Sequence, residues 1–463
     1  MDTNKNLLVT TPIGRLLLKF SLPAIASMIV NSLYNLVDRI FVGRIGALAM
    51  TGIGLSLPFM LLLSAVSSMI GIGASALISI KLGENNKDEA KGLLGNAITL
   101  IIGLMLLMTL LGLAFKMPIL KAFGASDVTM SYAVDYMTVI LYGAVFQGIG
   151  TGLLNVVRAT GHPVKSMMIV LVGTLINIIL DPILIFTFNM GISGAAWATI
   201  IAQLVTVIMV IHHFISEKNQ MKIEISQLKL RITTTMSILS IGFAPFVMQL
   251  SSVVVSILSN NALKTYGGDM AIGAMTIINA VMVIFLMSAM GITQGAAPLI
   301  GFNFGAKRFD RVKQLLKLEL IAVGAICTIT FILVQIFPVI LSSIFTSDTG
   351  LISMASSGMR LLLLMLPLLS AQMVGASYFQ AIGEAKKAAF LGLSRQVLLL
   401  IPLLLILPPL FGLNGVWGAS ALADLISSLI AILSLKSAFN HLNNLERQNG
   451  SEEYETMSSS IAE

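Results

Sequence analysis

Residues 73–91 read GASALISIKLGENNKDEAK, and residues 295–313 read GAAPLIGFNFGAKRFDRVK. The two stretches share Gly, Ala, Leu, Ile, Asp and Lys at equivalent positions, always 222 residues apart. The same spacing relates Pro23 to Pro245 and Gly161 to Gly383, and it shortens by one residue at Gly191 and Gly412. The chain is therefore an internal duplication, with one residue lost from a loop of the second copy.

The composition indicates a membrane protein. Of the 463 residues, 56% are hydrophobic and 11% are charged, whereas about 25% of a soluble domain is charged. Twelve apolar stretches are long enough to cross a hydrocarbon core of ~30 Å as helices. The expected spans are 14–42, 48–80, 92–115, 130–156, 164–188, 191–215, 236–263, 271–303, 311–337, 351–379, 388–410 and 412–438. The sequence predicts an all-α polytopic membrane protein with twelve transmembrane helices.

The basic residues predict the orientation of these helices. With both termini in the cytoplasm, all but six of the 28 Lys and Arg residues fall on the inner side or at inner helix ends. The six exceptions are Arg39, Arg44, Lys116, Lys121, Lys264 and Arg360. Because cytoplasmic loops carry an excess of Lys and Arg, the net charge of +7 reflects membrane topology. A nucleic-acid partner is not expected.

The duplication predicts two lobes in parallel orientation. Each copy holds six helices, an even number, so the second copy enters the membrane from the same side as the first. Transporters with such parallel repeats bind substrate at the interface between them. The expected parts are a cytoplasmic segment (1–13), a first lobe (14–215), a cytoplasmic linker (216–235), a second lobe (236–440) and a disordered cytoplasmic tail (441–463).

Three acidic residues within expected spans stand out: Asp38, Asp181 and Asp424. Asp135 ranks lower, because the polar stretch 126–131 blurs where its helix begins. A carboxylate in the membrane interior costs on the order of 3 kcal/mol or more, so such acids usually have a function. Asp38 and Asp181 lie at a similar depth below the outer surface, Asn177 precedes Asp181 by one helical turn, and Thr199 reaches the same level. These four side chains predict a site for a small cation or a proton. For Asp38, an ion pair with Arg39 at the headgroup level is the alternative.

The second copy does not repeat this cluster, because Asn260, Leu399, Leu403 and Ser420 stand at the equivalent positions. The ion chemistry is therefore expected in the first lobe alone. Asp424, which stands opposite Gln203, would serve substrate or a second cation, or would be a structural acid. Pro23 and Pro245 occupy equivalent places in the first helix of each half and could act as paired hinges.

The sequence offers no catalytic constellation. His162, His212, His213 and His441 lie at expected cytoplasmic ends without metal-ligand spacing, and surface positions are predicted for them. Motifs for nucleophilic catalysis, phosphate binding and redox chemistry are absent. Cys327 has no partner for an intrachain disulfide. Neither an enzymatic activity nor a cofactor is therefore expected.

The chain resembles the multidrug and toxic compound extrusion (MATE) family from about residue 14 to residue 439. The resemblance rests on FSLP (20–23), LVDRIFVG (36–43), RATG (158–161) and NIILDP (177–182), in this order and spacing within a duplicated framework. It implies a bacterial inner-membrane antiporter with V-shaped lobes, which expels organic cations in exchange for Na⁺ or H⁺. It also implies ion-coupling roles for Asp38, Asn177, Asp181 and Thr199 in the first lobe, and a hinge at Pro23.

The second branch of that family uses acids in the second lobe, and this chain has Gln249 and Ser251 in the corresponding region. Two alternatives remain: a lipid-linked sugar flippase, against which the scarcity of Arg and Lys in the expected helix interiors argues, and a membrane-embedded enzyme. The sequence leaves open whether Na⁺ or H⁺ is the coupling ion. The expected partners are small amphipathic drugs and the lipid bilayer, and the expected state is a monomer.

Overall fold

The computed structural model describes residues 11–216 and 221–462, and every regular element in these ranges is helical. Residues 1–10 of the expected N-terminal segment, residues 217–220 of the expected linker and residue 463 lie outside the described residues. The prediction of an all-α fold is therefore confirmed.

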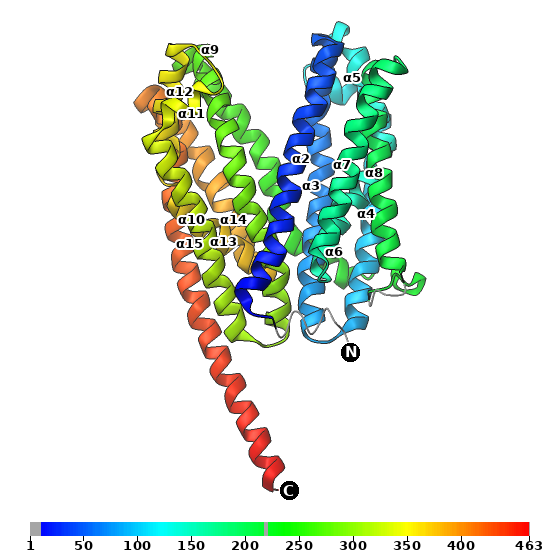
Figure 1. Cartoon of the computed structure of the whole chain (residues 1–463), viewed down its shortest axis with the longest axis vertical. Coiled ribbons are helices and arrows are strands. Elements are labelled where there is room, and N and C mark those ends of the chain that lie inside the picture. The colour runs from blue at the N-terminus through cyan, green and yellow to red at the C-terminus, as the bar shows by residue number, and fades with distance from the viewer. Residues whose placement is uncertain (1–10, 217–220, 463) are drawn as a thin grey trace. The chain divides into compact units, whose positions relative to one another are not determined.

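The first copy of the repeat forms seven α-helices and one short π-helix (Figure 1). They are α2 (Ile13–Ile45), α3 (Ala47–Gly83), α4 (Lys87–Ala122), α5 (Asp127–Tyr142), α6 (Ala144–Ala159), α7 (Pro163–Pro182), η1 (Ile183–Thr187) and α8 (Gly191–Ile215). Helices α5 and α6 form one span that bends by 56° at Gly143.

The second copy follows after the 3-10 turn η2 (Ile225–Leu228). Its elements are α9 (Ile232–Gly305), α10 (Phe309–Ile336), α11 (Pro338–Ser343), α12 (Thr349–Leu362), α13 (Leu366–Ala381), α14 (Ala385–Leu393), the π-helix η3 (Ser394–Leu400) and α15 (Ile401–Ala462). Helices α12 and α13 form a second bent span, with an angle of 54°.

The two longest helices, α9 and α15, are each interrupted by one glycine. In the described part of the chain, eight helices are long and apolar enough to span a membrane, or ten when each bent pair is one span. Helix α9 is interrupted at Gly268, where φ is 65°, and α15 at Gly412, where φ is 58°. This left-handed conformation favours glycine. With α9 and α15 each divided in two, the described residues provide twelve helical segments, the number that the sequence predicts.

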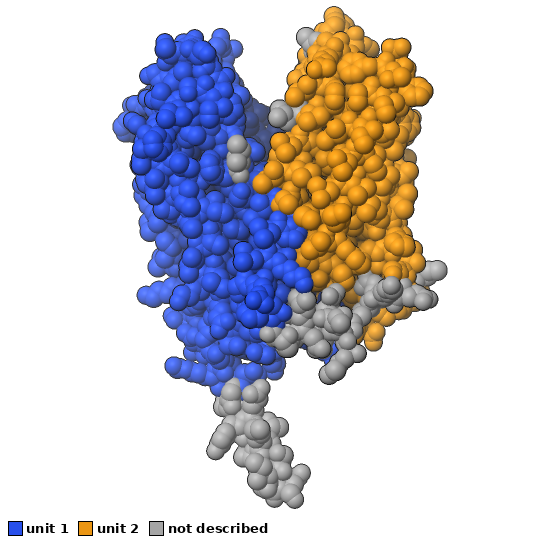
Figure 2. Space-filling model, viewed as in Figure 1, with its two compact units in different colours: residues 1–25, 79–85, 251–463 blue, residues 26–78, 86–250 orange. Residues whose placement is uncertain are grey.

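The described helices form two compact units whose boundaries differ from those of the sequence repeats (Figure 2). Unit 1 contains residues 1–25, 79–85 and 251–463, and unit 2 contains residues 26–78 and 86–250. The first part of α2 and the end of α3 thus belong with the second copy, and the first part of α9 belongs with the first copy.

Close glycine contacts explain this exchange of helix ends. In unit 2, a Cβ at Gly242 of α9 would lie 1.8 Å from the Met69 carbonyl oxygen of α3. In unit 1, a Cβ at Gly305 of α9 would lie 2.1 Å from the Ile80 carbonyl oxygen of α3, and one at Gly295 would lie 2.7 Å from Ser21 Cα of α2. Glycine allows membrane helices to approach backbone to backbone. These crossings therefore hold each helix end in the unit of its neighbour.

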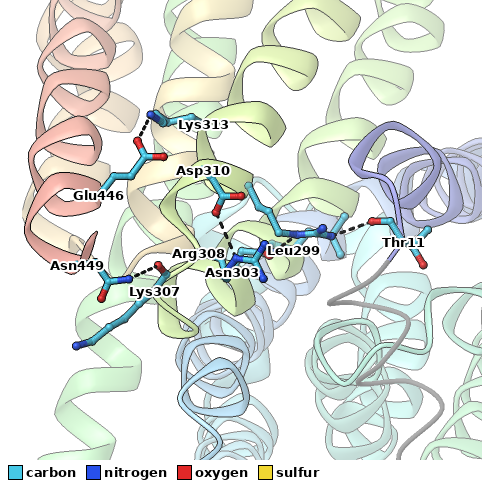
Figure 3. A network of polar contacts seen from close by, with 10 residues as sticks. Thr11, Leu299, Asn303, Lys307, Arg308, Asp310, Lys313, Glu446 and Asn449 are labelled. Atoms are coloured by element: carbon cyan, nitrogen blue, oxygen red, sulfur yellow. Dashed lines mark hydrogen bonds and ion pairs between the residues drawn. The ribbon is translucent and has the colours of Figure 1, made fainter. Parts of the chain in front are cut away.

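The end of α15 packs against unit 1 beyond the expected membrane span. Leu442 is fully buried in the main apolar core of this unit. Lys313 of α10 donates to Asn443 at 2.8 Å. Lys313 also forms an ion pair with Glu446, and Asn449 donates to the Lys307 carbonyl (Figure 3). The prediction of disorder is wrong for residues 441–449, because buried Leu442 and these polar contacts hold the helix in place.

The described part of the linker packs along α4. Glu224 forms a 2.7 Å ion pair with Lys91, the Leu228 carbonyl accepts from Thr99 Oγ1 at 2.8 Å, and the Arg231 amide donates to Asn96 Oδ1 at 2.8 Å. These contacts place the connector on unit 2.

Candidate ion-coupling site

The four residues predicted to bind the coupling ion come together in unit 2. Asp38 lies on α2, Asn177 and Asp181 on α7, and Thr199 on α8. Asp181 is fully buried, Asn177 and Thr199 are 2% and 6% exposed, and Asp38 is partly buried. Helices α7 and α8 pack closely against each other, which brings residues 22 positions apart in the chain into contact.

Asn177 links Asp181 to Thr199. With its amide oriented so that both atoms have suitable partners, Asn177 Nδ2 donates to Asp181 Oδ2 at 3.0 Å. Its Oδ1 then accepts from the Thr199 backbone amide at 3.2 Å. The Thr199 hydroxyl donates to the Ala195 carbonyl at 3.1 Å. The spacing of one helical turn on α7 thus positions the amide beside the carboxyl group.

The second oxygen of Asp181 is the unsatisfied atom of the site. Asp181 Oδ1 is buried and has no hydrogen-bond partner among the described residues. Asp38 and Asp181 are close enough to interact electrostatically. Two neighbouring carboxylates repel each other when both are ionised. A cation or a proton at this point would compensate the charge and provide Asp181 Oδ1 with a partner.

Two tyrosines that the sequence interpretation missed complete the site. Tyr34 precedes Asp38 by one turn of α2 and hydrogen-bonds to Thr199. Tyr136 of α5 is 3% exposed and lies within electrostatic range of both acids. The i, i+4 spacing of Tyr34 and Asp38 was the available sequence signal; Tyr136 carried none.

A polar cavity of about 170 Å³ adjoins these residues within unit 2. Tyr34, Asn177 and Thr199 form part of its wall. The other polar lining residues are Asn31, Gln147, Thr151, Thr174, Gln203 and Thr206. Gln147 is held by a 2.9 Å hydrogen bond from its Nε2 to Ser64 Oγ. The cavity therefore presents amide and hydroxyl groups and no charged side chain of its own.

The donor set fits a hard monovalent cation or a proton. Carboxylate, amide and hydroxyl oxygens are the available ligands at Asp38, Asn177, Asp181 and Thr199, and oxygen ligands suit hard cations. Among the described residues, no three His, Cys, Asp or Glu side chains cluster in a way that could hold a metal ion. The site thus lacks the nitrogen and sulfur ligands typical of transition metals.

Comparison with known proteins gives the family. The family model described as MatE matches residues 23–183 and 233–406, which is most of the chain. The chain belongs to the MatE family. The resemblance inferred from the sequence motifs is therefore confirmed.

The relatives of this MatE protein are similar along nearly their whole length. The multidrug export protein MepA of Staphylococcus aureus (strain MRSA252) is 28% identical over 424 residues, covering 91% of this chain and 93% of the relative. MepA of Staphylococcus saprophyticus is 27% identical over 420 residues, with coverages of 90% and 92%.

Solved structures share the fold of this MatE protein. A crystal structure of MATE in the bent conformation has a TM-score of 0.90 at 22% identity, covering 96% of this chain and 100% of the other. An outward-facing multidrug resistance MATE family transporter of the MOP superfamily has a TM-score of 0.89 at 22% identity, covering 96% and 99%.

Pro23 and Pro182 lie on the two helices that carry the acids of the site. Pro23 lies inside α2, which remains one helix from Ile13 to Ile45. Its role as a hinge stays a prediction, as does that of Pro245. Pro182 lies where α7 ends and the π-helix η1 begins, because proline lacks the N–H group that continues an α-helix.

The third acid predicted inside a span, Asp424, belongs to unit 1 and is paired. Its Oδ1 lies 2.5 Å from Arg395 Nε, and Asp424 is 3% exposed. The sequence interpretation counted Arg395 among the cytoplasmic basic residues. Arg395 lies in η3, inside the expected span 388–410, and its assignment to the cytoplasmic side stays a prediction. The charge of Asp424 is thus compensated by the protein itself.

Glu319 is an intramembrane acid that the sequence interpretation missed, although it lies inside the expected span 311–337. It is fully buried in α10, and neither carboxyl oxygen has a hydrogen-bond partner among the described residues. An ionised carboxylate in such surroundings is costly. Its position in an apolar span was the signal that would have identified it.

The predicted surface positions of the histidines are only partly correct. His213 of α8 is 5% exposed, and its ring packs edge-on against His162 with centroids 4.7 Å apart. Surface positions hold for His212 and His441, which are exposed. The prediction is wrong for His213, because its side chain turns toward α7 and the preceding loop and not to solvent.

Proposed function

We propose that this MatE protein exports organic cations and other amphipathic drugs in exchange for Na⁺ or H⁺, with the coupling ion bound at Asp38, Asn177, Asp181 and Thr199. The observation that carries the proposal is the buried, unpartnered Oδ1 of Asp181, held beside a second carboxylate and an oxygen-lined cavity. Relatives over nearly the whole chain bear the name multidrug export protein, which supports drugs as the cargo.

The chemistry of the site suggests how coupling works. When the ion is absent, the carboxyl groups of Asp38 and Asp181 carry excess negative charge in an apolar surrounding. Binding of Na⁺ or H⁺ removes that charge and gives Asp181 Oδ1 a partner. An ion that binds one conformation better than the other shifts the equilibrium between them. Bending of α2 at Pro23 is the proposed conformational response, and drug release to the outside is the proposed result.

The basic residues of unit 1 bear on the alternative function, that of a lipid-linked sugar flippase. A lipid-linked sugar flippase would require free positive charge for an anionic headgroup. Arg395 lies inside the expected span 388–410, and its guanidinium is engaged by Asp424. We therefore retain drug export as the proposal. We also propose a monomer in the bacterial cytoplasmic membrane with both termini in the cytoplasm, which the distribution of Lys and Arg supports.

The test is export of a fluorescent organic cation from proteoliposomes under a Na⁺ gradient and a pH gradient, imposed separately. Wild-type protein is expected to respond to at least one gradient, which identifies the ion. Asp181→Asn is expected to lose gradient-driven export while inserting normally. Asp135→Asn is the matched control, because Asp135 is an exposed acid of the same unit. Equal export by Asp181→Asn and wild type would refute the assignment.

A further inference from the structure

A second cavity lies in unit 1, far along the sequence from the proposed coupling residues. Its volume is about 360 Å³, and it is bordered by the end of α13, the start of α14 and the stretch of α15 around residues 434–441. This volume lies within the range of ligand pockets in proteins, roughly 300–1,000 Å³. Tyr378, Phe379, Glu384, Lys387, Ser437 and His441 supply most of its chemistry.

Tyr378 provides a buried donor without an acceptor. The residue is 1% exposed and forms part of the cavity wall, and its hydroxyl has no hydrogen-bond partner among the described residues. A buried hydroxyl without a partner is costly. The missing acceptor is thus expected to come from a molecule in the cavity.

Lys387 provides a cation at the same wall. Its Nζ lies 5.4 Å from the ring centroid of Phe379, an arrangement that holds the ammonium group by a cation–π interaction. Glu384 is the acidic lining residue, and its carboxylate lies 3.4 Å from Lys387 Nζ. Both side chains of this pair are exposed by more than 40%, and such exposed pairs are weak. Lys387 can therefore give up its contact with Glu384 for an anion that it binds more strongly.

The surroundings add positive charge and hydrogen-bond donors. Helix α14 starts at Ala385 without a side-chain cap, so its positive end lies next to Glu384 and Lys387. Helix α15 contributes Ser437 and His441 to the lining of the cavity. Lys386 and Lys436 lie exposed beside the lining residues on α14 and α15.

The position and the apolar part of the wall indicate the source of the anion. The distribution of Lys and Arg assigns this end of the helices to the cytoplasmic membrane surface. Ile382 and Ala438 line the cavity together with the ring of Phe379. A cavity with one apolar and one basic side, between membrane helices at this level, suits a lipid headgroup.

We propose that this cavity binds the phosphate of a membrane phospholipid headgroup, with Tyr378, Lys387 and Ser437 as its donors. The site is independent of the ion-coupling residues, because it lies in unit 1 and shares no residue with them.

The test is titration of the purified full-length protein in detergent with phosphatidylglycerol, with native mass spectrometry to count bound lipids. Tyr378→Phe removes only the hydroxyl, and Lys387→Met removes the charge and keeps most of the length. Each is expected to weaken binding of the first lipid by about tenfold, as loss of one charge-assisted hydrogen bond does. Lys436→Met is the matched control, because Lys436 is an exposed lysine of α15 outside the cavity lining, and it is expected to bind like wild type.

A parallel titration with glycerol phosphate distinguishes a lipid from a soluble phosphate ester. We expect the soluble compound to bind at least tenfold more weakly than the lipid, because it lacks the apolar part that contacts Ile382 and Phe379. Equal lipid binding by wild type, Tyr378→Phe and Lys387→Met would overturn the proposal. Preferential binding of glycerol phosphate would overturn the assignment to a lipid. The transport assay of the ion-coupling proposal is separate, so either can fail alone.

Discussion

Arg395 Nε lies 2.5 Å from Asp424 Oδ1 inside an apolar span of unit 1. Breaking a buried pair leaves one charge uncompensated, which costs about 3–5 kcal/mol. We therefore expect Arg395→Met alone to lower the thermal unfolding temperature in detergent markedly, and the double variant Arg395→Met with Asp424→Leu to recover most of that loss. A double variant no more stable than the single one would argue against a pairing role and in favour of a functional requirement for Asp424.

The crossing of α9 over α3 in unit 2 predicts a strong effect of one methyl group. A Cβ at Gly242 would lie 1.8 Å from the Met69 carbonyl oxygen, so Gly242→Ala must separate the two backbones. We expect a loss of about 2 kcal/mol or more in the free energy of unfolding, in line with overpacking of a close contact. Gly103→Ala on α4 is the control, because nothing lies within 4 Å of its Cβ position, and a change below about 1 kcal/mol is expected there. Similar unfolding curves for the two variants would contradict the crossing.

His162 predicts a pH dependence of stability. Burial, with a smaller contribution from Lys165, holds the pKa of His162 below its ordinary value of 6.5. As the pH falls below 6.5, the unfolded chain binds a proton that the folded protein does not, so stability decreases. The decrease ends once the pH is below the pKa of the folded state. His162→Asn is expected to flatten this part of the stability profile, measured by thermal unfolding between pH 7.5 and pH 5 (about one pH unit on each side of the ordinary pKa).

The control for this measurement is His212→Asn, the same substitution at an exposed histidine of the same unit. An unaltered profile in His162→Asn would show that other groups cause the pH dependence.

Replacing Glu319 with an apolar residue is expected to preserve or raise the stability of the protein. Its carboxyl oxygens have no partner among the described residues, and the side chain is fully buried in α10. Replacing an unpartnered buried polar group with an apolar group of similar size is neutral or stabilising. Glu319→Met is therefore expected to unfold at the same temperature as wild type or a higher one. A clear loss of stability would mean that Glu319 has a partner, such as a bound ion. Retained stability with lost export would assign it a role in transport.

Much of the fold followed from local features of the chain. The apolar stretches predicted twelve membrane helices because span length depends only on the run of residues in one segment. Asn177 and Asp181 could be paired in advance because a spacing of one helical turn places two side chains on one face. Alignment of the two copies also showed that the second copy has no Asp at the positions equivalent to Asp38 and Asp181.

Contacts between helices were harder to anticipate. Tyr136 joins the site from α5, and Arg395 meets Asp424 across two helices. Both depend on how each helix is rotated and where it crosses its neighbours, which no single segment encodes. The tail was misjudged for a related reason, since Leu442 and Glu446 become ordered through contacts with a different part of unit 1.

The sequence by itself determined the class of protein and the duplication. It also determined which acids lie in apolar spans, where a carboxylate is costly and usually has a function. Only the tertiary structure decided which acids are compensated: Asp424 by Arg395, Asp181 in part by Asn177, and Glu319 by no described residue. The physical reason is that the cost of a buried charge depends on the groups around it in space. Those groups come from helices brought together by glycine crossings such as Gly242 on Met69.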